Sequence, residues 1–284
     1  MLASFDFDQA EGLRRMLAGP KPRIVTFLSA TSSDDKGAML VNLGASLAQS
    51  GNDVMIVDAC QRDYGVARRL GVGQGGSLLQ VARQECALNQ VIHRVPQGFS
   101  VVNMGHAAHP VARAFQSSDD TRRLANTFDV LVKQSAGSII IVDGEFSPEG
   151  EFPVPVMASS EIVVQVSTSA LSITNAYALV KRLSQHLGRR PFGILVTGAT
   201  EAEAKVVYDN MSSAATRYLA VTVSSMGSVP ADEYLQRAAR LGRAVVDAFP
   251  LAGASVAFRQ LAGRFAGSGM AAGISAGLQQ GRAA

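Results

Sequence analysis

The sequence predicts one doubly wound α/β domain, in which helices flank a mostly parallel sheet on both sides. Short apolar runs without an alternating polar face recur along the chain, which is typical of strands buried on both faces. Stretches with apolar residues at helical spacing separate these runs. With 284 residues, 47% of them hydrophobic, the chain can bury a core of this size.

The first βαβ unit shows this pattern most clearly. Ile24–Leu28 is an apolar run that predicts a buried strand, and Ser29–Asp35 predicts a loop. Lys36–Gln49 has apolar residues at helical spacing, and Val54–Val57 predicts the next strand. Because the first turn of such a unit meets a helix N-terminus, it is the place where phosphate is held in folds of this class.

The same reading continues to the end of the chain. The strands bring their carboxyl ends to one edge of the sheet, where ligands bind in this fold class. The expected elements are helices at Ser77–Ala82 and Ala87–Ile92, a strand at Phe99–Asn103, a helix at Asp119–Gln134, strands at Ser138–Val142 and Glu161–Ser167, a helix starting at Ser169 or Ser172, a strand at Phe192–Thr197, a helix at Glu201–Leu219 and a strand at Val221–Val229.

The first turn resembles the MinD/ParA family of P-loop ATPases, whose loop K-G-G-x-G-K-T precedes a helix carrying V-N-L-A. Here V-N-L-G, at Val41–Gly44, sets the register. The resemblance places Lys36 on the phosphate-binding lysine and Gly37 on the magnesium-binding threonine. The remaining positions fall on Ser32, Ser33 and Asp35 for the three glycines and on Thr31 for the additional, partner-reaching lysine. Lys36 is therefore the only one of the six signature residues present.

These departures affect the chemistry of the loop. Loop glycines let backbone N–H groups surround a phosphate, which Ser and Asp do poorly. Asp34 and Asp35 would also face a polyanion, at a cost of about 1 kcal/mol in water and about 4 kcal/mol at an effective dielectric constant of 20. Lys36 can offset one of them, and Gly37 has no hydroxyl for a metal. We therefore favour an ordinary strand–helix turn, with Ser33 or Asp34 as the helix cap.

Other positions of the nucleotide site are altered too. Asp58 matches the family's acid after the second strand, but Cys60 replaces the acid that follows it. Asp143 stands at the end of the Walker B strand, and Thr197 replaces an asparagine that reads the base. Asp58 and Asp143 can hold a cation or cap loops, and both readings stay open. The vestigial nucleotide positions are Lys36, Gly37, Asp58, Asp143 and Thr197; we expect no cofactor, metal or catalytic residue, with ATP and magnesium as the alternative.

The N-terminus points to one branch of the family. The letters D-Q-A-x-x-L-R resemble the activator segment of the flagellar-number regulators FlhG and FleN, which contacts and stimulates the signal-recognition-type GTPase FlhF. The matching residues are Asp8, Gln9, Ala10, Leu13 and Arg14. The alternative is a helix folded back on the body. The run Ser172–Lys181 also resembles this branch.

The closing helix has two interpretations. Phe258, Leu261 and Phe265 share one face, and relatives use a C-terminal amphipathic helix to sit on the membrane. Packing of this face on the sheet is an equally good reading. We expect an activator-like helix at 1–20, the α/β domain at 21–266, and a disordered tail rich in Gly, Ala and Ser at 267–284.

Composition narrows the classes of function. A net charge of +3 from dispersed basic residues does not favour nucleic acid as a partner. Two cysteines, Cys60 and Cys86, without ligand spacing indicate a reducing compartment and a small buried role for Cys60. Without an apolar run of membrane-spanning length or a signal peptide, we expect a cytoplasmic protein, with peripheral contact at the inner face of the membrane as an alternative.

Together the resemblance implies a regulator of flagellar number or placement. Because the catalytic positions are altered, we expect it to act by protein binding and to have lost the hydrolysis and the binding of ATP. Its expected partners are an FlhF-like GTPase and flagellar switch proteins or a flagellar transcription factor. One rival is an atypical ATPase that uses Lys36, Asp58 and Asp143. The other is a MinD/ParA-like scaffold for another surface system, such as cellulose secretion or partitioning.

Overall fold

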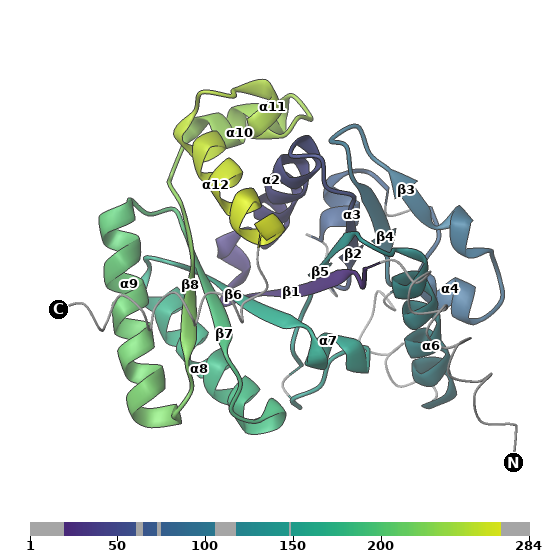
Figure 1. Cartoon of the computed structure of the whole chain (residues 1–284), viewed down its shortest axis with the longest axis horizontal. Coiled ribbons are helices and arrows are strands. Elements are labelled where there is room, and N and C mark those ends of the chain that lie inside the picture. Colours follow the sequence, from purple (N-terminus) through teal and green to yellow (C-terminus); the bar gives the residue numbers. More distant parts are fainter. Residues whose placement is uncertain (1–19, 61–64, 73–74, 106–117, 148, 268–284) are drawn as a thin grey trace, which may run out of the picture.

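The computed structural model confirms the expected fold class, with helices on both faces of a single sheet (Figure 1). It describes residues 20–60, 65–72, 75–105, 118–147 and 149–267. The expected activator helix and C-terminal tail fall on 1–19 and 268–284, outside the described residues.

The sheet has eight strands in the order β3-β4-β2-β5-β1-β6-β7-β8. All neighbours pair in parallel except β3 and β4, which are antiparallel. Because β1 lies between β5 and β6, its carboxyl end is at the point where the strand order reverses, the usual ligand position in this fold class. The strands are β1 (Arg23–Ser29), β2 (Val54–Asp58), β3 (Ile92–Arg94), β4 (Ser100–Asn103), β5 (Ile139–Asp143), β6 (Glu161–Ser167), β7 (Phe192–Thr197) and β8 (Val223–Val229).

Two layers of helices cover the sheet (Figure 1). One face carries α2 (Lys36–Gln49), α3 (Val66–Arg69), α10 (Glu233–Arg240), α11 (Val245–Ala248) and α12 (Gly253–Gly267). The other face carries α4 (Leu78–Ala82), α6 (Ser118–Gln134), α7 (Pro155–Ser159), α8 (Ala170–Leu187) and α9 (Glu201–Ala214), which continues into a π-helical turn, η3 (Ala215–Leu219).

The central strand β5 is apolar from Ile139 to Val142 because both of its faces are buried. In β5, Ile139 and Ile141 pack toward α2, whereas Ile140 and Val142 join the core on the opposite face. This arrangement explains the continuous apolar runs of the sequence.

The expected helix at Ala87–Ile92 is wrong. The structure has a single 3₁₀ turn, η2 (Leu88–Gln90), and Ile92 already begins β3, opposite Val102 of β4. The β-branched side chain of Ile92 favours a pleated strand at this position.

The closing helix α12 packs its apolar face on the domain. Phe258, Leu261 and Phe265 are only 1%, 2% and 1% exposed and lie in the core with residues of α2 and β8. Of the two readings of this helix, the structure shows the packed one, and the three residues expected to contact a membrane under the other reading are buried. Among the described residues, no helix is long and apolar enough to span a bilayer.

Candidate functional site

The loop after β1 is closed by its own carboxylates. It forms a short 3₁₀ turn, η1 (Ser32–Asp34), and then Asp35, which takes a left-handed conformation with φ of +46°. The Asp35 carboxylate accepts a hydrogen bond from the Ala38 backbone N–H at 3.3 Å and so caps α2. The expectation that Ser33 or Asp34 is the cap is wrong, because Asp35 tolerates the left-handed backbone that brings its side chain back to the helix.

Asp34 ties the loop to the neighbouring strand and helix. Its Oδ2 accepts from the Thr31 N–H at 2.9 Å and from the Ser172 hydroxyl of α8 at 3.0 Å. Its backbone oxygen accepts from the side chain of Gln165, in β6. The Asp34 carboxylate thus occupies the Thr31 amide and the Ser172 hydroxyl, which could otherwise donate hydrogen bonds to a bound anion.

Lys36 points inward, away from the loop carboxylates. Its Nζ lies 2.7 Å from Asp143 Oδ1 and also donates to the backbone oxygens of Phe27 and Gly144. Burial by itself would lower the pKa of the Lys36 ammonium, but the adjacent Asp143 carboxylate outweighs it, and the pKa is raised. The expectation that Lys36 offsets Asp34 or Asp35 is wrong, since Asp35 pairs with Arg69 instead.

Asp58 and Asp143 accept hydrogen bonds from the backbone at the start of α3. Asp58 accepts from the Ala67 N–H at 2.7 Å and from the Cys60 N–H at 3.0 Å, while Asp143 accepts from the Val66 N–H at 3.2 Å. A Cβ at Gly65 would lie 2.4 Å from Asp58, so this close approach requires glycine. The two carboxylates act as loop caps, one of the two readings of the sequence.

Opposing effects act on the pKa of Asp58 in this cluster. Burial, and then the negative charge of Asp143, raise the pKa of Asp58 to about 7, although the Ala67 and Cys60 amides and Lys36 act in the opposite direction. Cys60 is buried, as expected, and its Sγ lies 3.3 Å from Glu145 Oε1. Within the described residues, no three His, Cys, Asp or Glu side chains are grouped so as to hold a metal ion.

Thr197 lies apart from this cluster, at the edge of a large cavity. Its hydroxyl accepts from Gln165 Nε2 at 3.2 Å, and both residues line a space of about 920 Å³. The cavity extends from the β1–α2 loop to α10, along the carboxyl ends of β6, β7 and β8.

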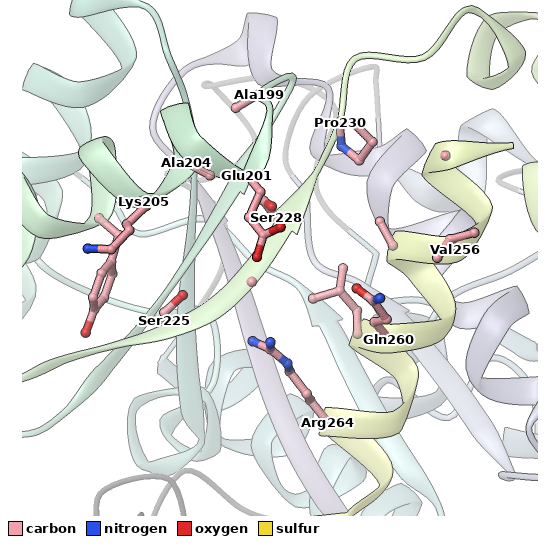
Figure 2. Close-up of a pocket in the computed structure, with 15 residues that line it drawn as sticks. Ala199, Glu201, Ala204, Lys205, Ser225, Ser228, Pro230, Val256, Gln260 and Arg264 are labelled. Carbon is pink, nitrogen blue, oxygen red and sulfur yellow. The ribbon is translucent and has the colours of Figure 1, made fainter. Parts of the chain in front are cut away.

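A smaller hollow of about 450 Å³ lies between α9 and α12, over β8. Figure 2 shows Glu201 of α9 and Arg264 of α12 extending over the strand from opposite walls. None of the expected nucleotide positions lines it.

The sequence identified the inner cluster but not its supporting residues. Lys36, Asp58 and Asp143 come together as expected, and Gly37 lies buried in the first turn of α2. The support given by Gln165 and by Gly65 was missed. A polar residue inside the apolar run of β6, and a glycine just before a short helix, were the available signals.

Comparison with known proteins identifies the family. No protein-family model matches the chain. The antiactivator FleN of Pseudomonas aeruginosa is 31% identical over 236 residues, which cover 78% of each chain. The chain belongs to the FleN family. An uncharacterized ATP-binding protein of Methanocaldococcus jannaschii is 22% identical over 245 residues, 86% of this chain and 88% of that protein.

Solved structures agree with a FleN-family chain on a MinD/ParA scaffold. MinD in the MinC:MinD cell division complex of Aquifex aeolicus matches with a TM-score of 0.65 at 16% identity, covering 87% of this chain and 96% of that one. A ParA family ATPase from Chlorobium tepidum matches with a TM-score of 0.63 at 16% identity, covering 84% and 98%. MinD of Pyrococcus horikoshii, solved with Mg-ADP, matches with a TM-score of 0.63 at 17% identity, covering 86% and 96%.

In this FleN-family chain, several groups at the first turn differ from those of an intact P-loop or are already bound by other side chains. A magnesium-bound nucleotide is held by free loop amides, an available lysine and a hydroxyl on the metal. Here Asp34 occupies the loop amide of Thr31 and Asp35 occupies an amide in the first turn of α2, while Lys36 is paired with Asp143 and Gly37 has no hydroxyl.

Proposed function

We propose that this FleN-family chain regulates flagellar number or placement by binding proteins, without binding or hydrolysing ATP. Its relative FleN is an antiactivator. By analogy, the body of the chain would bind a flagellar transcription factor or flagellar switch proteins, and the segment containing Asp8 to Arg14 would bind and stimulate an FlhF-like GTPase.

One observation carries the loss of nucleotide binding. The buried Lys36 ammonium is held by Asp143 and by two backbone oxygens, and its side chain is only 4% exposed. To reach a phosphate it would have to abandon a desolvated carboxylate, which is costly in a protein interior. The carboxylates of Asp34 and Asp35 would in addition have to leave the amides that they bind, one in the loop and one in the first turn of α2.

Isothermal titration calorimetry with ATP and magnesium tests this part of the proposal. We expect no affinity tighter than about 1 mM, which corresponds to roughly 4 kcal/mol of binding free energy. A MinD-type ATPase with an intact P-loop, titrated in parallel, is the positive control. Micromolar affinity for ATP would refute the proposed loss of binding.

The cellular role needs a separate test. Deleting the gene should change the number or position of flagella counted by electron microscopy, and the full chain should restore them. Unchanged flagellation after deletion would refute the flagellar role and favour a scaffold for another surface system.

An atypical ATPase is the second candidate function, because the cavity beside Thr197 is of ligand size. In that case ATP binding would place the base near Thr197, and calorimetry would detect it.

A further inference from the structure

Strand β8 lies at one end of the sheet, and among the described residues no strand pairs with its outer edge. It is seven residues long, whereas β3, at the other end of the sheet, has only three. The edge of an unpaired strand presents backbone N–H and C=O groups that can pair with another chain, and many proteins limit this by keeping edge strands short. The length of β8 leaves more of these groups at the open edge than β3 does.

Hydrogen bonds at both ends of β8 show which backbone groups face the open edge. The Thr222 carbonyl, just before β8, accepts from the Phe192 N–H of β7 at 3.1 Å, so it points into the sheet. At the other end, the Val229 carbonyl accepts from the residue that follows β7 and also points inward. Because successive carbonyl groups of a strand point to opposite edges, the Val223 carbonyl points outward. The Tyr208 hydroxyl of α9 indeed donates to it, at 3.1 Å.

The same alternation directs the backbone N–H and C=O groups of Ser225 and Ser228 to the open edge. Ser225 lies two residues after Val223, and Ser228 lies one residue before Val229; a register shift between β7 and β8 accounts for the odd spacing. Both serines line the hollow of about 450 Å³ between α9 and α12 (Figure 2). Within the described part of the chain, no backbone group outside the sheet bonds to either residue.

The hollow has room for an extended backbone beside β8. Its floor includes Gly227, which has no side chain, and small residues such as Ala204 and Ala257 form parts of the two walls. Its volume lies within the range of ligand pockets. Since side chains alternate along a strand, a segment laid along β8 would direct them in turn toward α9 and toward α12.

The two walls differ in the side chains that they favour. The α9 wall carries Glu201 and Lys205, whose charges are opposite, so it favours neither sign. The α12 wall offers the apolar side chains of Val256 and Leu261, and of its described residues Arg264 alone is charged. Arg264 is exposed, and no ion pair to it is seen within the described ranges. The side of a segment that faces α12 is therefore complementary when it combines apolar residues with one carboxylate.

We propose that the open edge of β8 binds an extended segment of a protein partner, which joins the sheet as a ninth strand. The backbone of this segment pairs with Ser225 and Ser228, and its side toward α12 carries apolar residues and a carboxylate that meets Arg264. In this mode of recognition the backbone bonds supply affinity, and the side-chain contacts supply specificity. The inference rests on the proposed function, because it gives the regulator a surface for binding a protein.

A synthetic peptide tests the pairing of backbones. The probe is a fluorescein-labelled peptide of alternating threonine and valine, with one glutamate in a valine position, titrated with the full chain and followed by fluorescence anisotropy. Two further peptides are N-methylated on alternate amides, one along each edge of the extended peptide. Because only one edge of an added strand pairs with β8, methylation of one edge should abolish binding and methylation of the other should leave it unchanged.

Two changes in the protein locate the site. Ser225→Pro removes an N–H that faces the open edge, where proline is tolerated, so this variant should fold and lose peptide binding. Arg264→Glu should weaken binding at least tenfold, whereas Arg240→Glu, an exposed arginine that lines the other cavity, should leave it unchanged. Circular dichroism and urea unfolding check that the variants fold. If Ser225→Pro does not fold, the two arginine variants and the methylated peptides decide.

Several results would overturn the proposal. They are a peptide that does not bind, equal effects of methylation at its two edges, and equal affinities of Arg264→Glu and Arg240→Glu. Another occupant of the edge would also overturn it. A second copy of the chain would appear as a dimer in sedimentation velocity that Ser225→Pro dissociates. The chain's own residues 268–284 would be indicated if the peptide bound only after their deletion.

Failure of the docking site and failure of the proposed function are distinguishable. Peptide binding together with unchanged flagellation after gene deletion would uphold the docking site while refuting the flagellar role. Abnormal flagellation without peptide binding would do the reverse.

Discussion

Lys36 and Asp143 form a pair whose members depend on each other. Both side chains are almost fully buried, at 4% and 1% exposure, and their charged atoms are 2.7 Å apart. A buried ion pair contributes little net stability compared with apolar residues of the same volume, but removal of one partner leaves an uncompensated charge. The loss of a structural lysine should therefore lower the stability of the protein, whereas the loss of a lysine that binds phosphate should lower nucleotide binding.

Lys36→Met should therefore destabilise the protein by about 3–5 kcal/mol, as measured by urea denaturation. The double variant Lys36→Met with Asp143→Leu should be much closer to the parent than the sum of the single effects predicts. If Lys36→Met unfolds at the same urea concentration as the parent but removes ATP binding, Lys36 serves a nucleotide and our interpretation fails.

Asp58 makes the stability of the protein depend on pH. Its pKa is raised from 3.8 to about 7, so between these values the folded protein binds a proton that the unfolded chain has released. Stability should therefore fall as the pH rises from about 4 to about 7, by at most about 4 kcal/mol from this group. Asp58→Asn cannot titrate and should flatten the urea midpoint over this interval; an unchanged slope in this variant would contradict the assignment to Asp58.

At the scale of elements, the sequence predicted most strands and helices because apolar periodicity reports local geometry. The bounds of α2, β6 and β7 agree with expectation to the residue. The sequence fell short where tertiary structure decides: Ile92 joined a strand because β4 is its neighbour. Of the two readings of the closing helix, the packed one is observed, because α2 lies in the same core as Phe258.

The inner site was predictable in its membership but not in its pairing. Asp58 and Asp143 end adjacent strands, β2 and β5, so the topology implied that they meet. The local sequence does not show which carboxylate pairs with the Lys36 ammonium, because Asp34, Asp35 and Asp143 all carry the opposite charge. The folded structure decides the pairing: Asp35 contacts Ala38 and Arg69, and Lys36 pairs with Asp143.

The N-terminal segment carries the prediction on which the GTPase partner depends. Leu13→Ala should weaken binding to an FlhF-like GTPase by about 2 kcal/mol, roughly thirtyfold, because an amphipathic helix binds a groove through its apolar anchors. Glu11→Ala, outside the matching letters, is the control and should bind normally.

A peptide of residues 1–19 should by itself stimulate the hydrolysis of GTP by the cognate enzyme. An inert peptide, together with normal flagellation after deletion of these residues, would favour the scaffold alternative.

For the whole molecule, nucleotide should not control assembly. In the resemblance to MinD/ParA proteins, Thr31 takes the position of the lysine that reaches across to a partner subunit, and Thr cannot make that contact. Sedimentation velocity with and without ATP and magnesium should give the same distribution of species. A shift to a dimer on addition of ATP would contradict this prediction.

The closed pair of Lys36 and Asp143 also has a consequence for regulation in the cell. A nucleotide-driven switch has a timer, because hydrolysis ends its active state. If this chain does not hydrolyse ATP, as proposed, it has no such timer, and its output would follow its concentration relative to its partners. Cells would then set flagellar number through the dosage of this protein, and its rate of synthesis and degradation would take the place of a catalytic cycle.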